Sequence, residues 1–301
     1  DYSANEICLA NGAKQAIANA ILSIIEQGDE VIMLAPFWVS YEITVRFAGG
    51  TPVVLHASVE ENYKVPASRI AAAITPKTKL IVLNSPSNPS GAVWSKAELQ
   101  ELANIVRAHP HLMVLSDEIY EYIIFDGEMN SFGALPGMRE RTITVNGFSK
   151  GFAMTGWRLG YVHAAPEVIA QARKVHDFLT VGAAAPLQHA VVTALNFPAS
   201  YYDDLAAEYA TSRDVLLSYL DRTGLSYTRP EGAYFVMVDI SCFGYASDVE
   251  FSHWMAKEIG VAPVPGSSFF ATGENRYIRL NFAKKPATLH AAGERLLKLK
   301  R

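Results

Sequence analysis

One lysine lies in a setting that suits covalent chemistry. Lys150 and the preceding Ser149 lie shortly after the apolar, strand-like run 142–145, and Arg158 comes eight residues after Lys150. A neutral amine forms a Schiff base with a carbonyl compound, and a guanidinium binds a phosphate group through two parallel hydrogen bonds. Although a single lysine is most often a solvated surface charge, this spacing favours covalent attachment of a phosphorylated aldehyde such as pyridoxal phosphate.

Further small, polar and aromatic residues follow other apolar runs of the chain. In open α/β sheets, ligands bind beyond the carboxyl ends of the strands, so these positions are candidates for the same site. They are Gly12, Ala13 and Lys14 after the run 6–10, Trp38 after 31–34, Asn88 after 80–83, and Asp117 and Tyr120 after 112–115.

Each of these positions offers chemistry that a heterocycle with a phosphate would need. Small residues at Gly12 and Ala13 allow backbone N–H groups at a helix start to approach an anion. Trp38 could stack on a flat ring, and the Asn88 amide could bond a ring oxygen. Each also has an ordinary structural explanation, as a turn glycine, a core aromatic or a turn asparagine bonded to its own backbone.

Asp117 and Tyr120 complete this candidate set. A carboxylate directly after a buried strand is poorly solvated and needs a cationic or hydrogen-bonding partner, which a protonated pyridine nitrogen would provide. Tyr120 could donate to the ring oxygen. Asp117 could instead cap a helix, but the joint occurrence of all these residues at successive strand ends favours a cofactor site.

Periodicity predicts the elements that position these residues. From residue 6 to about 165, short apolar runs alternate with helical patterns, which is typical of a mostly parallel sheet covered by helices on both faces. The runs are 6–10, 31–34, 52–55, 80–83, 112–115 and 142–145. A helix is predicted over 95–107, where Ser95 and Glu98 form a capping box.

The second half of the chain has a different pattern. Helices are predicted over 166–178, 186–195 and 201–220, then over 249–259 and 286–299, with strands over 233–240 and 277–282. We therefore expect an α/β protein with a large ligand-binding domain over 1–207 and a smaller C-terminal α/β domain over 208–301.

Composition excludes several classes of function. Of the 301 residues, 50% are hydrophobic and 19% are charged, as in a packed globular protein. The net charge of −4 gives no basic surface for nucleic acid or anionic membrane. Two distant cysteines, Cys8 and Cys242, indicate neither a disulfide framework nor a metal site, so we expect a cytoplasmic protein. Neither a membrane span nor a signal peptide is predicted.

The motifs in combination resemble a known family. The run 147–160 (GFSKGFAMTGWRLG), with SPSNPSG at 85–91 and SDEIY at 116–120, is similar to the class I/II aminotransferases, the aspartate aminotransferase superfamily of fold type I pyridoxal phosphate enzymes. The resemblance covers essentially the whole chain. It implies a homodimer with its site at the interface, acting on small-molecule amino acids and 2-oxo acids.

The resemblance also implies residue roles. Lys150 would carry the cofactor and shuttle protons, Asp117 would contact the pyridine nitrogen, and Trp38 would stack on the ring and border the substrate. Asn88 and Tyr120 would contact the ring oxygen, and the phosphate would be bound by Gly12, Ala13, Ser149 and Arg158. Lys14, beside the cofactor, would bind a distal carboxylate of the substrate. Arg279, in the run 277–282, would bind the substrate α-carboxylate, with Asn88 nearby.

Different parts of the chain resemble aminotransferases that act on different substrates. Residues 12–14 and 36–41 resemble bacterial aspartate aminotransferases, whereas 173–180 and 278–297 look more like the methionine, aromatic and kynurenine aminotransferases. We expect transfer from aspartate or from aromatic and methionine-like amino acids to a 2-oxo acid such as 2-oxoglutarate. A pyridoxal phosphate C–S lyase of the same fold and a non-catalytic ligand-sensing domain remain as alternatives.

Family members carry a substantial segment before the phosphate-binding residues, which supplies part of the small domain and of the substrate pocket. The 301 residues begin at Asp1 and reach a strand-like run by residue 6. We therefore expect the chain to be a fragment, or its sequence to omit residues, with the N-terminal part of the small domain missing.

Overall fold

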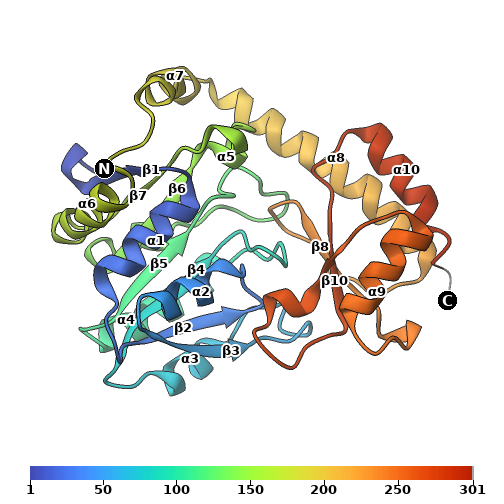
Figure 1. Ribbon diagram of the computed structural model, residues 1–301, viewed down its shortest axis with the longest axis horizontal. Coiled ribbons are helices and arrows are strands. Elements are labelled where there is room, and N and C mark those ends of the chain that lie inside the picture. Colours follow the sequence, from blue (N-terminus) through green and yellow to red (C-terminus); the bar gives the residue numbers. More distant parts are fainter. Residues whose placement is uncertain (300–301) are drawn as a thin grey trace.

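The computed structural model describes residues 1–299 and contains a seven-stranded sheet (Figure 1). Its order is β1-β7-β6-β5-β4-β2-β3. The neighbours β3, β2, β4, β5 and β6 are parallel, and β7 is antiparallel to both β6 and β1. The strands are Ile7–Ala10 (β1), Glu30–Ala35 (β2), Thr51–His56 (β3), Thr78–Asn84 (β4), Met113–Asp117 (β5), Thr142–Gly147 (β6) and Gly160–His163 (β7).

Six of these strands match the predicted apolar runs, and β7 is the exception. In β7, buried Gly160 and Val162 alternate with the half-buried Tyr161 and His163, so no continuous apolar run marks it. The strand nevertheless determines the sheet, because it lies between β6 and β1 and pairs with both. It thereby brings the ends of these two strands to one place.

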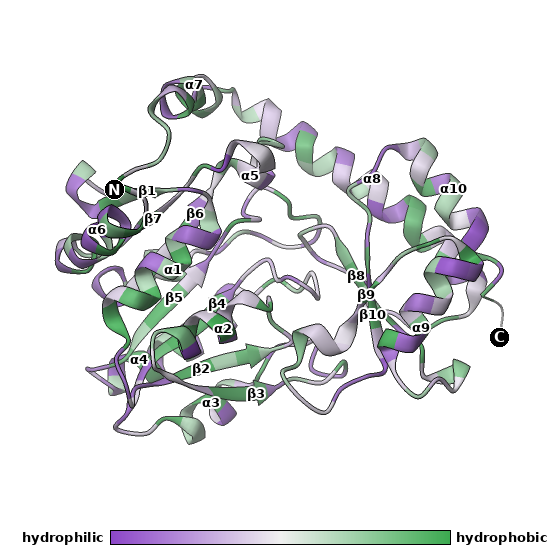
Figure 2. Cartoon of the chain, viewed as in Figure 1, coloured by the Kyte–Doolittle hydropathy of each residue, from purple (hydrophilic) through white to green (hydrophobic). Residues whose placement is uncertain are grey.

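Helices cover both faces of this sheet, and the apolar strands between them are green in Figure 2. One core cluster includes Ile17 of α1 and Val145 of β6, and another joins Leu99 of α4 to Val114 of β5. All four side chains are essentially inaccessible to solvent, which explains why the strands are apolar on both faces. The helices are Ala13–Ile24 (α1), Ser40–Phe47 (α2), Ala67–Ala73 (α3), Lys96–Ala108 (α4), Phe148–Gly151 (α5), Pro166–Thr180 (α6) and Ala185–Leu195 (α7).

The start of α4 confirms a local prediction. The backbone N–H of Glu98 donates to Ser95 Oγ at 3.3 Å, and the Ser95 N–H donates to the Glu98 carboxylate at 2.7 Å. This reciprocal capping box satisfies two backbone donors that a helix start leaves free.

The rest of the chain builds a second, three-stranded antiparallel sheet in the order β8-β10-β9. Three helices pack with it around a separate core cluster. The elements are Ala199–Thr223 (α8), Phe235–Asp239 (β8), Asp248–Trp254 (α9), Val264–Pro265 (β9), Tyr277–Asn281 (β10) and Pro286–Leu296 (α10). The predicted fold class, a mostly parallel helix-covered sheet with a smaller C-terminal α/β part, is confirmed.

The long helix α8 connects the two parts, as Figure 1 shows. Its 25 residues run without interruption and end at Gly224, which has the left-handed conformation (φ +73°) that favours glycine at this position. The predicted domain boundary between 207 and 208 lies inside this helix and stays a prediction. Within residues 1–299, none of the helices combines the length and the apolar character needed to cross a membrane.

Candidate active site

One cavity lies where the carboxyl ends of β4, β5 and β6 meet the start of α1. The empty space in it, counting the part open to solvent, is about 660 Å³. Nine of the eleven predicted site residues line it: Ala13, Lys14, Trp38, Asn88, Asp117, Tyr120, Ser149, Lys150 and Arg158. The tertiary structure thus collects side chains that the sequence spreads over nearly 150 positions.

Two glycines allow the phosphate-side residues to converge. A Cβ at Gly160 would lie 2.5 Å from the backbone nitrogen of Ala13, and a Cβ at Gly12 would lie 2.3 Å from Arg158 Nη2. Gly12 also has φ +83°, which disfavours any side chain. The Arg158 guanidinium therefore lies directly against the start of α1, where backbone N–H groups and the helix dipole favour an anion.

Asp117, the last residue of β5, is the buried carboxylate of the cavity. Tyr41 Oη donates a 2.6 Å hydrogen bond to Asp117 Oδ2, and the Ile119 N–H donates to Oδ1 at 3.2 Å. Asn84 Nδ2 donates to the Asp117 carbonyl at 2.9 Å and holds the backbone at this point. These hydrogen bonds orient the carboxylate before any ligand arrives.

Burial has a direct effect on the Asp117 carboxyl group. Loss of solvent raises its pKa from 3.8 to about 6, although the hydrogen bonds from Tyr41 and Ile119 and the Lys150 charge oppose this shift. Burial and the neighbouring Asp117 also raise the pKa of Tyr41, which therefore stays a donor. A cationic ring nitrogen beside Asp117 would lower its pKa again, because an opposite charge favours the ionised form.

Asp117→Asn tests this burial cost without any cofactor. Because folding raises the pKa of Asp117, its protonated carboxyl group contributes to the unfolding free energy. This contribution is fully present below about pH 4 and is lost as the pH rises through about 6. The loss amounts to about 3 kcal/mol. We expect the unfolding free energy of wild type, relative to Asp117→Asn, to fall by about this amount between about pH 4 and pH 8 in urea titrations.

The exposed Glu140, whose side chain retains 65% of its accessible surface, provides the control. Glu140→Gln should leave the pH dependence of the unfolding free energy as in wild type. A wild-type minus Asp117→Asn difference that stays constant over this pH range would show that Asp117 does not titrate as a buried group.

Lys150 reaches the cavity from α5, directly after β6. Its Nζ lies 6.0 Å from the centre of the Tyr120 ring and 5.6 Å from that of Tyr234. The two rings pack edge to face at 5.2 Å, and burial, with Tyr234 as the next cause, raises the pKa of Tyr120 well above its ordinary value. Lys150 therefore lies beside two aromatic rings, one of which, Tyr120, keeps its hydroxyl proton.

Arg279 extends from β10 of the second sheet toward the same region. Its guanidinium carbon lies 4.1 Å from the Phe235 ring centre and 4.8 Å from that of Phe269, and Nη1 donates to Asn88 Oδ1 at 2.6 Å. Burial lowers its pKa. Its Nε atom is buried without a hydrogen-bond partner among the described residues, so an incoming carboxylate would satisfy it.

Lys14 and Trp38 form the side of the cavity next to α1. Lys14 Nζ lies 5.2 Å from the centre of the Trp38 ring, and Trp38 packs edge to face on Tyr41 at 5.4 Å. With Lys150 and Arg158, Lys14 makes three cations in a lining that contains one carboxylate, Asp117. Such a lining suits a ligand with a phosphate or carboxylate group.

These observations fit a phosphorylated pyridine aldehyde. The glycine cradle beside Arg158 suits the phosphate, the buried Asp117 suits a protonated ring nitrogen, and Lys150 is an amine within the same cavity. Ser149, next to Lys150, also faces the cavity, as does Tyr120. The roles of these residues remain predictions.

Several site residues escaped the sequence reasoning. The cavity lining also contains Tyr41, Asn84 and Thr155, and Tyr234 lies beside Lys150. Tyr41 lies in the same aromatic run as Trp38, just after β2, and this nearness to a strand end was the available signal. Tyr234 had none, because its position depends on how the second sheet packs.

Comparison with known proteins gives consistent matches over nearly the whole chain. The family described as aminotransferase class I and II matches residues 1–296. A bifunctional aspartate aminotransferase and glutamate/aspartate-prephenate aminotransferase from Petunia hybrida is 39% identical, over 99% of this chain and 64% of that protein. The kynurenine–oxoglutarate transaminase of Dictyostelium discoideum is 36% identical, over 98% of this chain and 77% of that protein.

A solved structure agrees with these matches. The aspartate aminotransferase from Rhizobium meliloti superposes with a TM-score of 0.92 at 36% identity, over 99% of this chain and 77% of that one. The chain therefore spans between 64% and 77% of the lengths of these three proteins.

Proposed function

From the premise that the chain belongs to the class I and II aminotransferases, we propose that it is a pyridoxal phosphate-dependent aminotransferase. It moves the amino group of an L-amino acid to a 2-oxo acid such as 2-oxoglutarate. The family resemblance drawn from the motifs is confirmed, and members of this family use pyridoxal phosphate. The binding of this cofactor by this chain and the choice of substrates belong to the proposal.

One observation carries the proposal. A lysine, a buried carboxylate and an arginine packed on a glycine converge on one cavity from different strand ends. Structural roles explain each residue separately, but they do not explain why Lys150, Asp117 and Arg158 line the same cavity. A cofactor that carries an aldehyde, a ring nitrogen and a phosphate needs these three groups together.

When bound, pyridoxal phosphate supplies an aldehyde that condenses with amines and a protonated ring that withdraws electrons from the adjacent carbon. Lys150 provides the amine that holds the aldehyde in the resting enzyme. The free, neutral Lys150 Nζ would remove the proton from the substrate α-carbon as a general base and would deliver it to the aldehyde carbon of the cofactor as a general acid. The Asp117 carboxylate, oriented by Tyr41, keeps the ring nitrogen protonated.

The other residues bind and orient. Arg158, Ser149 and the backbone of Gly12 and Ala13 would hold the phosphate, and Trp38 would stack on the ring. Asn88 and Tyr120 would bond the ring oxygen. Arg279 binds the substrate α-carboxylate through two parallel hydrogen bonds, which would also satisfy its buried Nε. Rigid positioning of both reactants then favours proton transfer at the α-carbon.

A half-reaction screen tests the proposed activity. The protein is loaded with pyridoxal phosphate, single amino acids are added, and loss of the visible Schiff-base absorbance is followed, with 2-oxoglutarate then added to restore it. Restoration supports amino transfer. Formation of pyruvate and ammonia from cystathionine without any 2-oxo acid requirement would instead identify a C–S lyase, and absence of any spectral change would contradict both.

Lys14→Ala tests the substrate class. If Lys14 holds a distal carboxylate, the variant should raise KM for aspartate about tenfold, since one charge-assisted hydrogen bond is lost. KM for phenylalanine or methionine should change less than about twofold. Steady-state kinetics with these donors measures the difference, and Lys257→Ala, at an exposed lysine with 83% of its side-chain surface accessible, is the control. Equal effects on all donors would remove Lys14 from this role.

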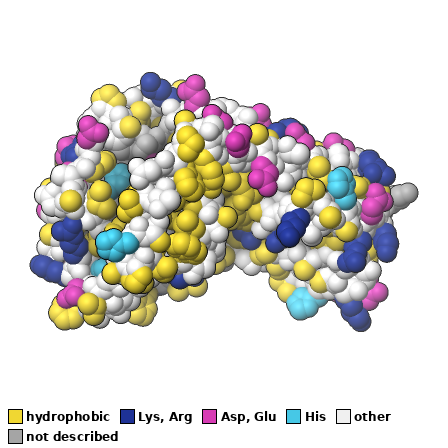
Figure 3. Space-filling view, turned by 90° about the horizontal axis from the view of Figure 1, so that it is seen from above, with side chains coloured by type: hydrophobic (Ala, Val, Ile, Leu, Met, Phe, Trp, Pro, Cys, Tyr) yellow, Lys and Arg dark blue, Asp and Glu magenta, His cyan; other side chains and the backbone are white. Residues whose placement is uncertain are grey.

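Two further parts of the proposal concern the state of the protein. The first is a homodimer. Hydrophobic side chains form a band on the face seen in Figure 3, and α6, the turn after it and α7 expose Phe178, Val181 and Leu195, a pattern that favours a partner. Light scattering should give twice the 32.9 kDa of one chain.

The second part of the proposal is a cytoplasmic location. The free Cys8 and Cys242 support it, and a fluorescent fusion would test it.

A further inference from the structure

A loop from the second part of the molecule reaches across to the first sheet. The residues Arg229–Ala233, here called the tip loop, lie between α8 and β8. They contact two segments that follow strands of the first sheet, 85–93 after β4 and 123–126 after β5. The tip loop therefore lies between the segments that carry Asn88 and continue from Tyr120.

Three hydrogen bonds attach the tip loop to the segment 85–93. The N–H groups of Glu231 and Gly232 both donate to the Gly91 carbonyl, at 3.0 and 2.8 Å, and the Glu231 carboxylate accepts from the Val93 N–H at 2.8 Å. A Cβ at Gly91 would lie 2.4 Å from Pro230 Cβ, and Gly91 has φ +74°. The close approach therefore requires glycine here.

Backbone hydrogen bonds attach the same loop to the segment 123–126. The Ala233 N–H donates to the Ile123 carbonyl at 2.9 Å, and the Phe125 N–H donates to the Glu231 carbonyl at 2.8 Å. Glu231 thus uses its N–H, its carbonyl and its carboxylate for contacts with both segments. No other residue of the tip loop makes three such contacts among the described residues.

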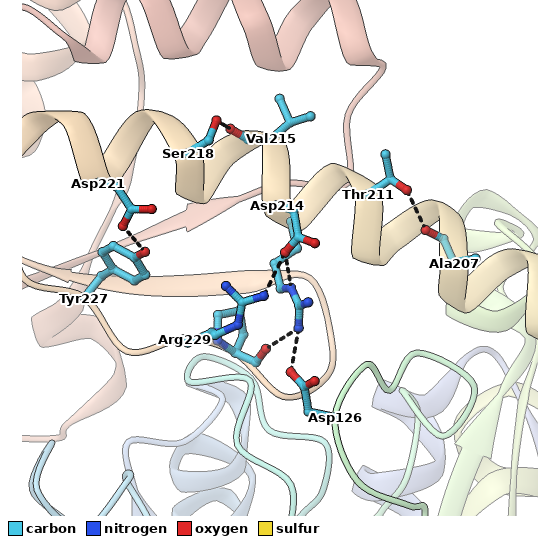
Figure 4. Close-up of polar contacts among 11 residues, drawn as sticks. Asp126, Ala207, Thr211, Asp214, Val215, Ser218, Asp221, Tyr227 and Arg229 are labelled. Carbon is cyan, nitrogen blue, oxygen red and sulfur yellow. Dashed lines mark hydrogen bonds and ion pairs between the residues drawn. The ribbon is translucent and has the colours of Figure 1, made fainter.

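Helix α8 supports the loop from the other side. Arg213, with only 6% of its side chain exposed, donates to Asp126 at 2.8 Å and to the Pro230 carbonyl at 3.2 Å. Arg229 pairs with Asp214 at 2.9 Å. Figure 4 shows Arg229 beside Asp214 of the helix, with Asp126 on the segment below. The loop is thereby held on three sides.

The fixed segment includes a residue that contacts the proposed substrate arginine. Asn88 lies between Ser85 and Val93, and its Oδ1 accepts from Arg279 Nη1 at 2.6 Å. Val93 is held at both backbone groups, because its carbonyl also accepts from Lys64 Nζ at 3.3 Å. Release of the Val93 N–H would loosen the segment that orients Arg279.

We propose that Glu231 is a positioning residue for the carboxylate-binding arginine, acting through Val93 and Asn88. This inference rests on the proposed function, since it assumes that Arg279 binds the α-carboxylate. The carboxylate of Glu231 fixes the segment 85–93, this segment fixes Asn88, and Asn88 fixes the guanidinium. Lys150 and Asp117 lie on other segments and keep their positions when Glu231 is replaced.

Steady-state kinetics of Glu231→Ala gives the first test. The KM for the amino-acid donor should rise about tenfold while kcat changes less than about twofold, because carboxylate binding is impaired and the proton transfer is not. Glu231→Gln retains an oxygen that accepts from the Val93 N–H and should return KM to within about twofold of wild type. Glu101→Ala, at an exposed glutamate of α4, is the matched control.

Hydrogen exchange of the cofactor-free protein gives a second test that needs no activity. In Glu231→Ala the Val93 amide should exchange about tenfold faster than in wild type, because its acceptor is lost. Exchange in Glu231→Gln should match wild type, and peptides from α4 should be unchanged in both variants.

The outcomes separate this inference from the proposed function. Unchanged exchange at Val93 in Glu231→Ala overturns the inference, as does a KM equal to that of Glu101→Ala in an active enzyme. If wild type transfers no amino group, the proposed function fails and the positioning role for a substrate carboxylate fails with it. Faster exchange at Val93 would then still show that Glu231 holds this segment.

Discussion

Lys150→Ala should remove both the visible Schiff-base absorbance and amino transfer, with turnover falling by at least about 10⁴-fold in the presence of added pyridoxal phosphate. The substitution deletes the amine that holds the cofactor and the base that removes the α-proton, so two functions are lost together. Absorbance spectra and a coupled assay for the 2-oxo acid product measure these losses separately.

The chain offers a matched control for this prediction. Lys257→Ala removes an amine of the same kind from the surface, where 83% of the side chain is exposed, and should leave spectrum and rate unchanged. Lys150→Arg keeps a positive charge in the cavity but cannot form the Schiff base, and it should be as inactive as the alanine variant. Turnover retained by Lys150→Ala would contradict the assignment of the cofactor lysine.

Arg279→Leu should lower kcat/KM for amino-acid donors by about 10³-fold while the Schiff-base absorbance remains, because two charge-assisted hydrogen bonds to the α-carboxylate are lost. Leucine keeps apolar contact with Phe235 and Phe269, which lie on the two sides of the guanidinium. The fold should therefore survive, and titration with the donor should show the loss in KM as well as in kcat/KM.

Arg276 is the natural control, since it lies three residues before Arg279, pairs with Glu274 and leaves 55% of its side chain exposed. Arg276→Leu should leave kcat/KM within about twofold of wild type. Arg279→Lys should recover only part of the activity, because an ammonium cannot form the two parallel hydrogen bonds of a guanidinium. Equal kinetics of the two leucine variants would exclude Arg279 from carboxylate binding.

These two substitutions separate the halves of the proposed site. Lys150 follows β6 and Asp117 ends β5 of the first sheet, whereas Arg279 belongs to the second. A variant that loses the cofactor spectrum indicates damage to the cofactor-binding residues of the first sheet. A variant that keeps the spectrum but binds amino acids poorly indicates damage to the substrate-binding residues of the second. Glu231 belongs with the second group although the segment it holds, 85–93, follows β4 of the first sheet.

The sequence predicted the fold class and the family correctly, and the physical reasons are local. The strands β2, β4 and β5 lie under helices on both faces, so burial requires the continuous apolar runs that were recognised. Ser95 and Glu98 predicted the start of α4 because a capping box involves residues only three apart. The strand β7 was missed because half of its four residues are only partly buried.

Lys150, Asp117 and Arg158 were predicted as site residues from the sequence, since each lies close to a strand end and strand ends can be recognised locally. Their convergence on one cavity could not be deduced in the same way. It depends on β7 pairing with both β6 and β1, which brings Gly147 opposite Gly160 and Gly160 opposite Ala10. That pairing joins segments about 150 residues apart.

The sequence by itself determined which residue types were present for the chemistry and which strand each one follows. Only the tertiary structure decided their partners: Tyr41 donates to Asp117, Tyr234 lies beside Lys150, and Asn88 holds Arg279. These contacts join elements that are distant along the chain. They arise because the two sheets, and the loop that carries Glu231 between them, pack in one arrangement that no local pattern of residues encodes.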